Sequence, residues 1–168
     1  GELFSMFHNH ADIVKLACVA QSVNVIAPIR TAPGGRLWKQ TVFYPFSLTS
    51  RYGRGVALKL ELPPEILDCL YMSAIWNPDR SELVLFITSR QLDSPVSFCC
   101  PLIGFEPAGT VEAVTLSAAD SRAVNTETHS PVVPHESGEI TLSRDGVSGT
   151  LEPVSWNMVR IPGHRSAD

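Results

Sequence analysis

VALKLEL, residues 56–62, marks the point where the hydrophobic pattern of the chain changes, and it decides the fold class. In this stretch four aliphatic side chains alternate with one alanine and two charged side chains. Successive side chains of a β-strand point to opposite faces, so this period of two predicts a strand. The same period returns in residues 83–88 (LVLFIT) and 96–101 (VSFCCP), which predict two further strands.

Five more short segments downstream have strand character, and polar turn signals such as Asn77-Pro78-Asp79 separate the strands. These segments are residues 71–76, 110–116, 139–142, 147–151 and 156–161, with further turn signals at Asp93-Ser94-Pro95 and Asp145-Gly146. Short strands at this spacing predict a mainly β fold, an antiparallel β-sandwich of the jelly-roll kind. The longest loop, residues 118–137, is polar and rich in proline, and we expect it to pack across a surface instead of forming core.

The N-terminal segment has two interpretations that hydrophobic periodicity leaves open. In the first, residues 4–21 form one helix, whose apolar side chains recur every three or four positions and which Gln21 merely ends. In the second, residues 2–8 end a helix, residues 9–12 form a polar break, and residues 13–20 form a short strand buried on both faces.

A second helix is predicted after a loop rich in proline and glycine at residues 28–35. We expect this helix over residues 44–52, because Pro45 is tolerated only in a first helical turn. Gly53 and Gly55 then close it.

Composition bounds the class of protein. The 168 residues are 44% hydrophobic, which is enough for one compact domain. The net charge of −4, without a basic cluster longer than a pair, argues against nucleic acid as a partner. The chain has no apolar run near 18 residues and no signal-peptide pattern, so we expect no membrane association and a cytoplasmic location.

The four cysteines show no C-x-x-C spacing and are expected to be buried, reduced thiols. Cys99 and Cys100 are adjacent within a predicted strand, so their side chains should point to opposite faces.

The segment before the first strand is dense in distinctive motifs: AQSVNVIAPI (20–29), PGG (33–35), YPF (44–46) and SRYGRG (50–55). In this order they resemble the segment that closes the catalytic barrel in the α-L-arabinofuranosidases of glycoside hydrolase family 51. The resemblance continues through LVLFITSR (83–90), residues 123–126 with 132–135, and LEPVSWNMVRI (151–161). It implies that the chain is similar to the last third of such an enzyme.

The resemblance also implies a division into two domains. Residues 1–54 would be the last helix, strand and helix of a (β/α)8 barrel, and residues 55–168 would be the β-sandwich. It favours a strand over residues 13–20, which would be the eighth strand of that barrel. Gln21 would then lie at the C-terminal end of a barrel strand, where such enzymes place functional residues.

Catalytic carboxylates are not expected in this chain. Retaining glycosidases use two carboxylates about 5 Å apart, one as acid/base and one as nucleophile. In the resembling family these are glutamates at the ends of the fourth and seventh barrel strands, and no glutamate of this chain matches their motifs. We expect the glutamates here to be solvated, and the chain by itself to be inactive on arabinosides.

Gln21 and Trp38 are the predicted substrate-binding residues. The resemblance implies that the Gln21 amide reaches the arabinose subsite, where it could donate to and accept from sugar hydroxyls. The alternative is a buried amide that bonds the backbone. Trp38 could stack on a sugar ring near the mouth of the site, or could anchor its short loop to the core.

No metal site and no cofactor are expected. His8 and His10 would diverge on a helix, and the further ligands of a metal site are missing around them. No G-x-S-x-G motif follows a strand, so a serine hydrolase site is not indicated either.

The leading hypothesis is therefore the C-terminal part of an exo-acting, retaining α-L-arabinofuranosidase. Its expected partners are an arabinose-containing oligosaccharide, the N-terminal catalytic part, and further copies of itself in a homo-oligomer. Two alternatives belong to other classes of protein. One is a carbohydrate-binding β-sandwich, which needs a row of exposed aromatic side chains on one sheet face. The other is a self-associating interaction domain, since a lone barrel edge leaves apolar surface uncovered.

Overall fold

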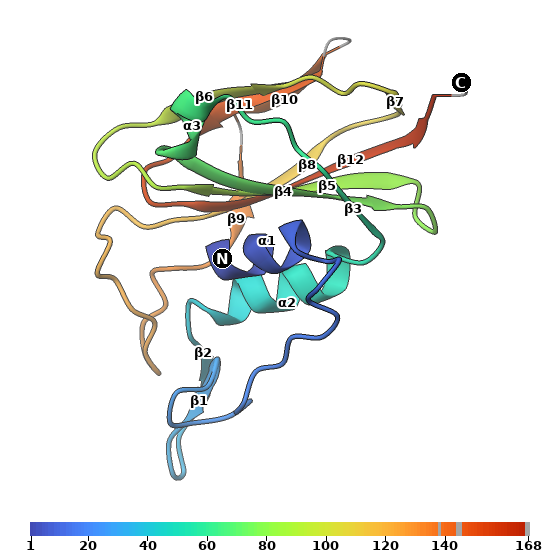
Figure 1. Ribbon diagram of the computed structural model, residues 1–168. Coiled ribbons are helices and arrows are strands. Elements are labelled where there is room, and N and C mark those ends of the chain that lie inside the picture. The colour runs from blue at the N-terminus through green and yellow to red at the C-terminus, as the bar shows by residue number, and fades with distance from the viewer. Residues whose placement is uncertain (138, 144–145, 167–168) are drawn as a thin grey trace.

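The computed structural model describes residues 1–137, 139–143 and 146–166, and within these the chain forms three helices and twelve strands (Figure 1). The elements are α1 (Glu2–Asn9), β1 (Ile29–Thr31), β2 (Leu37–Lys39), α2 (Phe43–Tyr52), β3 (Val56–Leu58), α3 (Pro64–Leu67), β4 (Leu70–Asn77), β5 (Glu82–Ser89), β6 (Val96–Cys100), β7 (Phe105–Pro107), β8 (Glu112–Leu116), β9 (His135–Glu136), β10 (Ile140–Ser143), β11 (Gly146–Leu151) and β12 (Trp156–Arg165).

Two antiparallel sheets build the main body. The larger has the order β3-β4-β5-β12-β8-β9, and β7 pairs with the last residues of β12. The smaller has the order β10-β11-β6 and lies over one face of the larger sheet (Figure 1). This arrangement confirms the predicted antiparallel sandwich. A separate hairpin of β1 and β2 projects from the other side.

A first core cluster fills the space between the two sheets. It includes Leu85, Val159 and Ile161 from the larger sheet, and Val147 and Leu151 from β11. Each of these side chains is at most 1% exposed. Burial of such a side chain contributes about 1.5–3 kcal/mol, so this cluster is the main source of the sandwich's stability.

A second core cluster lies on the opposite face of the larger sheet, which α1 and α2 cover (Figure 1). There Phe86 and Trp156 stack with ring centroids 5.9 Å apart, and Tyr52 of α2 packs against them. The larger sheet is therefore a middle layer. This explains why residues 83–88 are apolar at both alternating sets of positions, since each set meets a different covering layer.

Polar contacts attach α1 to the sheet. Asn9 donates from Nδ2 to the carbonyl of Met72 over 2.9 Å, and His8 Nδ1 lies 3.1 Å from Ser73 Oγ. The helix ends at Asn9, so the interpretation of residues 4–21 as one continuous helix is wrong.

The alternative prediction, a strand over residues 13–20, is also wrong: these residues lie in turn and irregular backbone. A strand buried on both faces needs hydrogen-bonded neighbours, and no strand of the described residues pairs with this segment. Its apolar side chains face solvent instead, with Ile13 75% and Leu16 81% exposed.

The strand predicted over 56–62 is shorter than expected. Of these residues only 56–58, which form β3, pair with β4. The chain leaves the sheet after Leu58, because Leu60 and Leu62 pack into the first core cluster. Pro63 and Pro64 follow, and neither has an N–H to donate to a ladder. The other predicted strands form within one or two residues of their expected bounds, apart from a longer β12, and α2 matches the helix predicted over 44–52.

Three further expectations are corrected or fall outside the description. The 118–137 loop does contribute to the core, since Val132 is buried in the second cluster. Cys18 and Cys99 are exposed, so only part of the expected burial of the thiols is found, although all four thiols are free. Asp145, half of a predicted turn, lies outside the described residues.

Candidate functional site

Gln21 and Trp38 both belong to the hairpin lobe, defined here as residues 20–42, which carries β1 and β2 away from the sandwich (Figure 1). The lobe is built on Asn24, whose Oδ1 accepts from the Thr31 backbone N–H over 2.7 Å. Its Nδ2 donates to Thr31 Oγ1 over 2.9 Å. These bonds hold residues 23–29 in a tight turn beside β1. An isolated bridge between Val23 and Ile29 joins the start of this turn to β1.

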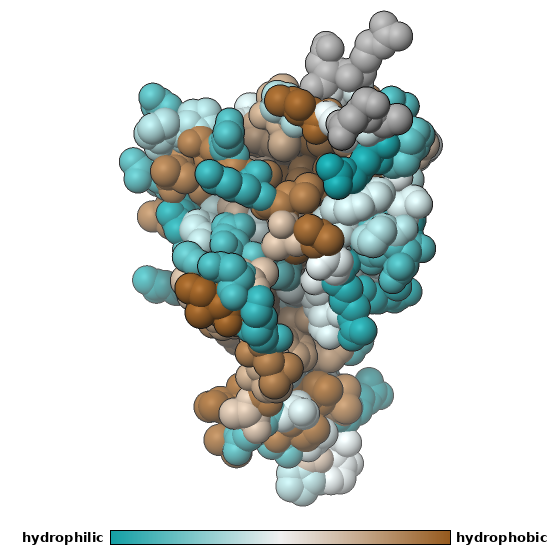
Figure 2. Space-filling view, turned by 45° about the vertical axis from the view of Figure 1, so that its right-hand side comes forward, coloured by the Kyte–Doolittle hydropathy of each residue, from teal (hydrophilic) through white to brown (hydrophobic). Residues whose placement is uncertain are grey.

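Hydrophobic residues gather on the surface of the hairpin lobe (Figure 2). The exposed members are Val23, Val25, Ile26, Leu37 and Val42. Val25 has φ of 55°, a left-handed conformation that costs a β-branched residue energy. So much uncovered apolar surface on one small lobe is typical of a protein–protein contact.

Gln21 is exposed at the start of the lobe, two residues before the Val23 bridge. Because it is exposed, the alternative interpretation of a buried amide bonded to backbone is wrong. The strand that was expected to carry it is not formed, so its role in binding substrate stays a prediction.

Trp38 lies half-buried in β2, opposite Arg30 of β1. The Arg30 guanidinium lies 6.0 Å from the centroid of the indole ring, at the outer limit of a cation–π contact. The indole Nε1 is buried, yet no acceptor for it is found among the described residues. A buried N–H without an acceptor is costly, so this donor is suited to an acceptor from outside the chain.

The hairpin lobe is attached to the sandwich through the 118–137 loop. Asn125, which is 2% exposed, donates from Nδ2 to the carbonyls of Lys39 (3.0 Å) and Val132 (2.8 Å). Its Oδ1 accepts from the Val132 N–H over 3.0 Å. Glu127 Oε1 accepts from the Arg36 backbone N–H over 2.8 Å. Asn125 and Val132 belong to the motif at residues 123–126 and 132–135, but the motif did not indicate this junction, because the partners of the lobe lie far away in the chain.

The carboxylates with defined partners are committed to structural contacts. Glu82 is 3% exposed, contrary to the expectation of solvated glutamates, and its Oε2 accepts from Arg160 Nε (3.0 Å) and Nη2 (2.6 Å). Glu152 accepts from Ser117 Oγ and lies 3.3 Å from His135 Nε2. The bond from Ser117, with a smaller contribution from His135, lowers the pKa of Glu152. A general acid needs a raised pKa, so Glu152 is unsuited to that role.

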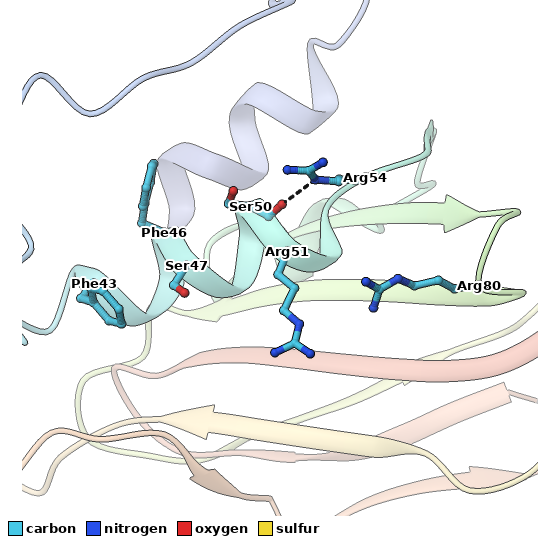
Figure 3. Close-up of a pocket in the computed structure, with 7 residues that line it drawn as sticks. All are labelled: Phe43, Phe46, Ser47, Ser50, Arg51, Arg54 and Arg80. Carbon is cyan, nitrogen blue, oxygen red and sulfur yellow. Dashed lines mark hydrogen bonds between the residues drawn. The ribbon is translucent and has the colours of Figure 1, made fainter. Parts of the chain in front are cut away.

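Two surface hollows stand out on the described part of the chain, and neither of these two is lined by Gln21 or Trp38. The first, about 480 Å³ in volume, runs along α2 and is called the α2 groove below (Figure 3). The second, of about 340 Å³, lies between the start of α2 and Trp156.

Two other classes of site receive no support from the described residues. All described aromatic side chains are at least half-buried, so the exposed row that a carbohydrate-binding sandwich needs is not found among them. Within residues 1–137, 139–143 and 146–166, no group of three or more His, Cys, Asp or Glu side chains could hold a metal ion. No helix of the described chain is long and apolar enough to cross a membrane.

Comparison with known proteins identifies what the chain is similar to. The family model of the α-L-arabinofuranosidase C-terminal domain matches residues 1–155. An intracellular exo-α-(1→5)-L-arabinofuranosidase 1 from Bacillus subtilis is 36% identical over 172 residues, which cover 96% of this chain and 34% of that protein. An exo-α-(1→6)-L-arabinofuranosidase from Bifidobacterium longum is 35% identical over 175 residues, 96% of this chain and 33% of that protein.

Comparison with solved structures leads to the same family of enzymes. A solved family 51 α-L-arabinofuranosidase from Bifidobacterium longum superimposes with a TM-score of 0.78 at 26% identity, covering 96% of this chain and 33% of that one. The chain therefore spans about one third of the length of these relatives.

Proposed function

The chain belongs to the α-L-arabinofuranosidase C-terminal domain family, and from this membership we propose that it is part of an exo-acting, retaining α-L-arabinofuranosidase. The whole enzyme would hydrolyse terminal arabinofuranosyl groups of plant oligosaccharides or polysaccharides without a cofactor. The single observation that carries the proposal is the family match over residues 1–155, with relatives named for this activity.

The share of this chain in that activity is structural. The described glutamates with defined contacts bind arginine, serine or backbone groups of the fold, as Glu82 and Glu152 illustrate. We assign the two catalytic carboxylates to the part of the enzyme that precedes this chain in its relatives.

Residues 1–54 form the C-terminal edge of the catalytic barrel in this proposal, and residues 55–168 form the sandwich that braces it. In its support, the two sheets of the sandwich begin at β3, directly after α2, and the hairpin lobe presents apolar surface that the described residues leave uncovered.

Gln21 and Trp38 are the proposed substrate-binding residues. The Gln21 amide is free to reach sugar hydroxyls because it is exposed, and the Trp38 indole N–H lacks an acceptor within the described chain. Both lie on the lobe that would complete the barrel.

The relatives' names include "intracellular", which supports a cytoplasmic location for the enzyme. The uncovered apolar residues of the hairpin lobe also support contacts between copies in a homo-oligomer, which light scattering would measure.

Activity measurements test the proposed function. The chain is produced alone and joined to the polypeptide encoded upstream of residue 1 in the same reading frame. Each preparation is then assayed on an aryl α-L-arabinofuranoside and on α-1,5- and α-1,6-linked arabinosides. We expect no turnover by the chain alone and turnover by the joined enzyme. Release of arabinose by the chain alone at an ordinary enzymatic rate would overturn the assignment of catalysis to the other part.

A further inference from the structure

The α2 groove combines apolar and positively charged walls (Figure 3). Its lining comprises two phenyl rings, two serines and three arginines: Phe43, Phe46, Ser47, Ser50, Arg51, Arg54 and Arg80. Arg51 extends from α2 and Arg80 from the turn between β4 and β5, so two elements distant in sequence supply its charge.

Three guanidinium groups crowd around Tyr52 beside the groove. The Cζ atoms of Arg160, Arg51 and Arg80 lie 4.4, 5.1 and 5.4 Å from the centroid of its ring. The ring face attracts each cation, but a neutral ring cancels no charge. Like charges gathered around one ring repel one another unless carboxylates compensate them.

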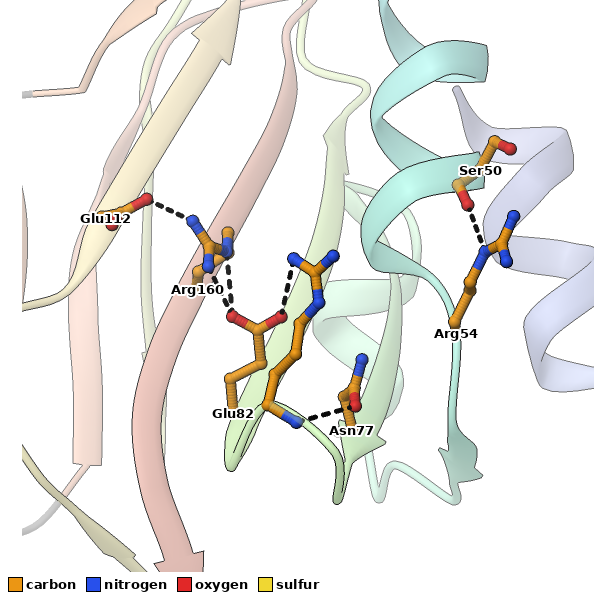
Figure 4. A network of polar contacts seen from close by, with 7 residues as sticks. Ser50, Arg54, Asn77, Glu82, Glu112 and Arg160 are labelled. Carbon is orange, nitrogen blue, oxygen red and sulfur yellow. Dashed lines mark hydrogen bonds and ion pairs between the residues drawn. The ribbon is translucent and has the colours of Figure 1, made fainter.

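The carboxylates nearby are already engaged. Arg160 lies between Glu82 and Glu112 and bonds both (Figure 4). Arg80 reaches only to 3.9 Å from Glu82 Oε1, and this oxygen accepts no hydrogen bond from any described group.

The other two arginines of the groove, Arg51 and Arg54, have less compensation of their charge. Arg54 donates from Nε to the backbone carbonyl of Ser50, and within the described chain neither Arg51 nor Arg54 forms an ion pair. Among the described residues, four arginines in and beside the groove thus have two carboxylates to compensate them, a local excess of positive charge in a chain whose net charge is −4.

We propose that the α2 groove is a docking surface for an acidic polypeptide segment of the preceding catalytic part, whose Asp or Glu side chain pairs with Arg51 and Arg80. The inference rests on the proposed function, because the partner is the part of the enzyme that this chain lacks relative to its relatives. Charge complementarity selects the occupant. A neutral arabinoside offers no counter-charge, whereas a carboxylate flanked by apolar side chains matches both the arginines and the phenyl rings.

Binding between the two parts is the direct test. The full chain is mixed with the separately produced upstream polypeptide, after circular dichroism has verified that this polypeptide is folded, and their Kd is measured at low and high salt. The double variant Arg51→Gln/Arg80→Gln should bind about tenfold more weakly at low salt, since it removes both partners of the incoming carboxylate. The wild-type Kd should rise toward that of the variant at about 1 M salt, where the screening length falls to about 3 Å.

Two control variants separate charge from folding and from general electrostatics. Arg51→Lys/Arg80→Lys keeps the charge and should keep the affinity within a few-fold. Arg165→Gln removes one positive charge at the exposed far end of β12, away from α2, and should leave the Kd unchanged. Thermal melting of each variant alone shows whether a weaker Kd arises from the groove or from unfolding.

The outcomes distinguish this inference from the proposed function. Equal affinity of the glutamine variant and the wild type, or no binding between the wild-type parts at any salt, would overturn the docking surface. Salt-sensitive binding in an assembly that does not hydrolyse arabinosides would support the docking surface and overturn the proposed activity.

Discussion

Asn125 donates a hydrogen bond from Nδ2 to the carbonyl oxygen of Lys39, 86 residues earlier in the chain, over 3.0 Å. The same side chain bonds both backbone polar groups of Val132, so it joins the hairpin lobe to the 118–137 loop. Replacing Asn125 by alanine leaves buried backbone groups without partners, and we expect a loss of about 2–3 kcal/mol in the free energy of unfolding. Urea denaturation measures it.

Gln21→Ala is the matched control for that variant, since it removes an exposed amide. The change in the free energy of unfolding should stay within about 0.5 kcal/mol. If Asn125→Ala is no more destabilising than Gln21→Ala, the junction does not hold the lobe in place.

Val25→Gly tests the backbone strain in the hairpin lobe. Val25 has φ of 55° and a side chain that is 70% exposed, so glycine removes strain and little packing. We expect the free energy of unfolding to rise by about 0.5–1 kcal/mol, because relief of the strained conformation exceeds the added flexibility of the unfolded chain. The matched change Val124→Gly, at an exposed valine without positive φ, should lower stability instead. Equal destabilisation by both variants would mean that no strain is stored at Val25.

The sandwich could be predicted because the hydrophobic pattern of each strand is contained in its own local sequence. Residues 83–88 and 156–161 are short, mainly apolar segments bounded by turn signals, and both of their faces meet a covering layer in the structure. The segment 13–20 shows the limit of the same reasoning. An apolar run indicates burial only if neighbours exist to bury it, and within the described chain those neighbours are missing.

The surroundings of the candidate site were less predictable than its residues. Gln21 and Trp38 came from motif resemblance, whereas Asn125 acts through partners 7 and 86 residues away, which no local pattern reveals. The β1–β2 hairpin was missed for a related reason. Its strands have three residues each, too few for an alternating pattern to stand out from a loop.

Arg160→Met tests the buried ion pair with Glu82. Glu82 is 3% exposed and accepts two bonds from Arg160, so loss of the arginine leaves a buried carboxylate whose one remaining cation among the described residues is Arg80, 3.9 Å away. We expect a loss of about 3–5 kcal/mol in the free energy of unfolding. The double variant Arg160→Met/Glu82→Leu should recover most of that loss, because it removes both charges. A double variant as unstable as Arg160→Met alone would show that packing of the arginine, and not its charge, stabilises this edge of the sheet.

His8 makes the docking of α1 sensitive to pH. Its ring packs 5.2 Å from the Phe86 ring, its Nδ1 faces Ser73 Oγ, and its burial lowers its pKa below the ordinary value of 6.5. Between the folded and unfolded pKa values the unfolded chain binds more protons, so the free energy of unfolding rises with pH in that window. The stabilisation by neutral His8 is complete above about pH 6.5 and is lost as pH falls below it. Denaturation midpoints measured at a series of pH values should show this slope.

His8→Phe keeps an aromatic ring in the same position without a titrating group, and should remove the part of the slope that lies just below pH 6.5. The acidic limb of the profile should remain in that variant. Arg90 lowers the pKa of Glu2. The hydrogen bond from Ser117, with a smaller contribution from His135, lowers the pKa of Glu152. The stabilisation by both carboxylates is therefore present above about pH 4.5 and is lost only below it. Because the His8 window begins just below pH 6.5, above the start of the acidic limb, a variant profile identical to the wild type just below pH 6.5 would show that α1 is docked by its apolar side chains and by Asn9, with no energetic contribution from the neutral imidazole.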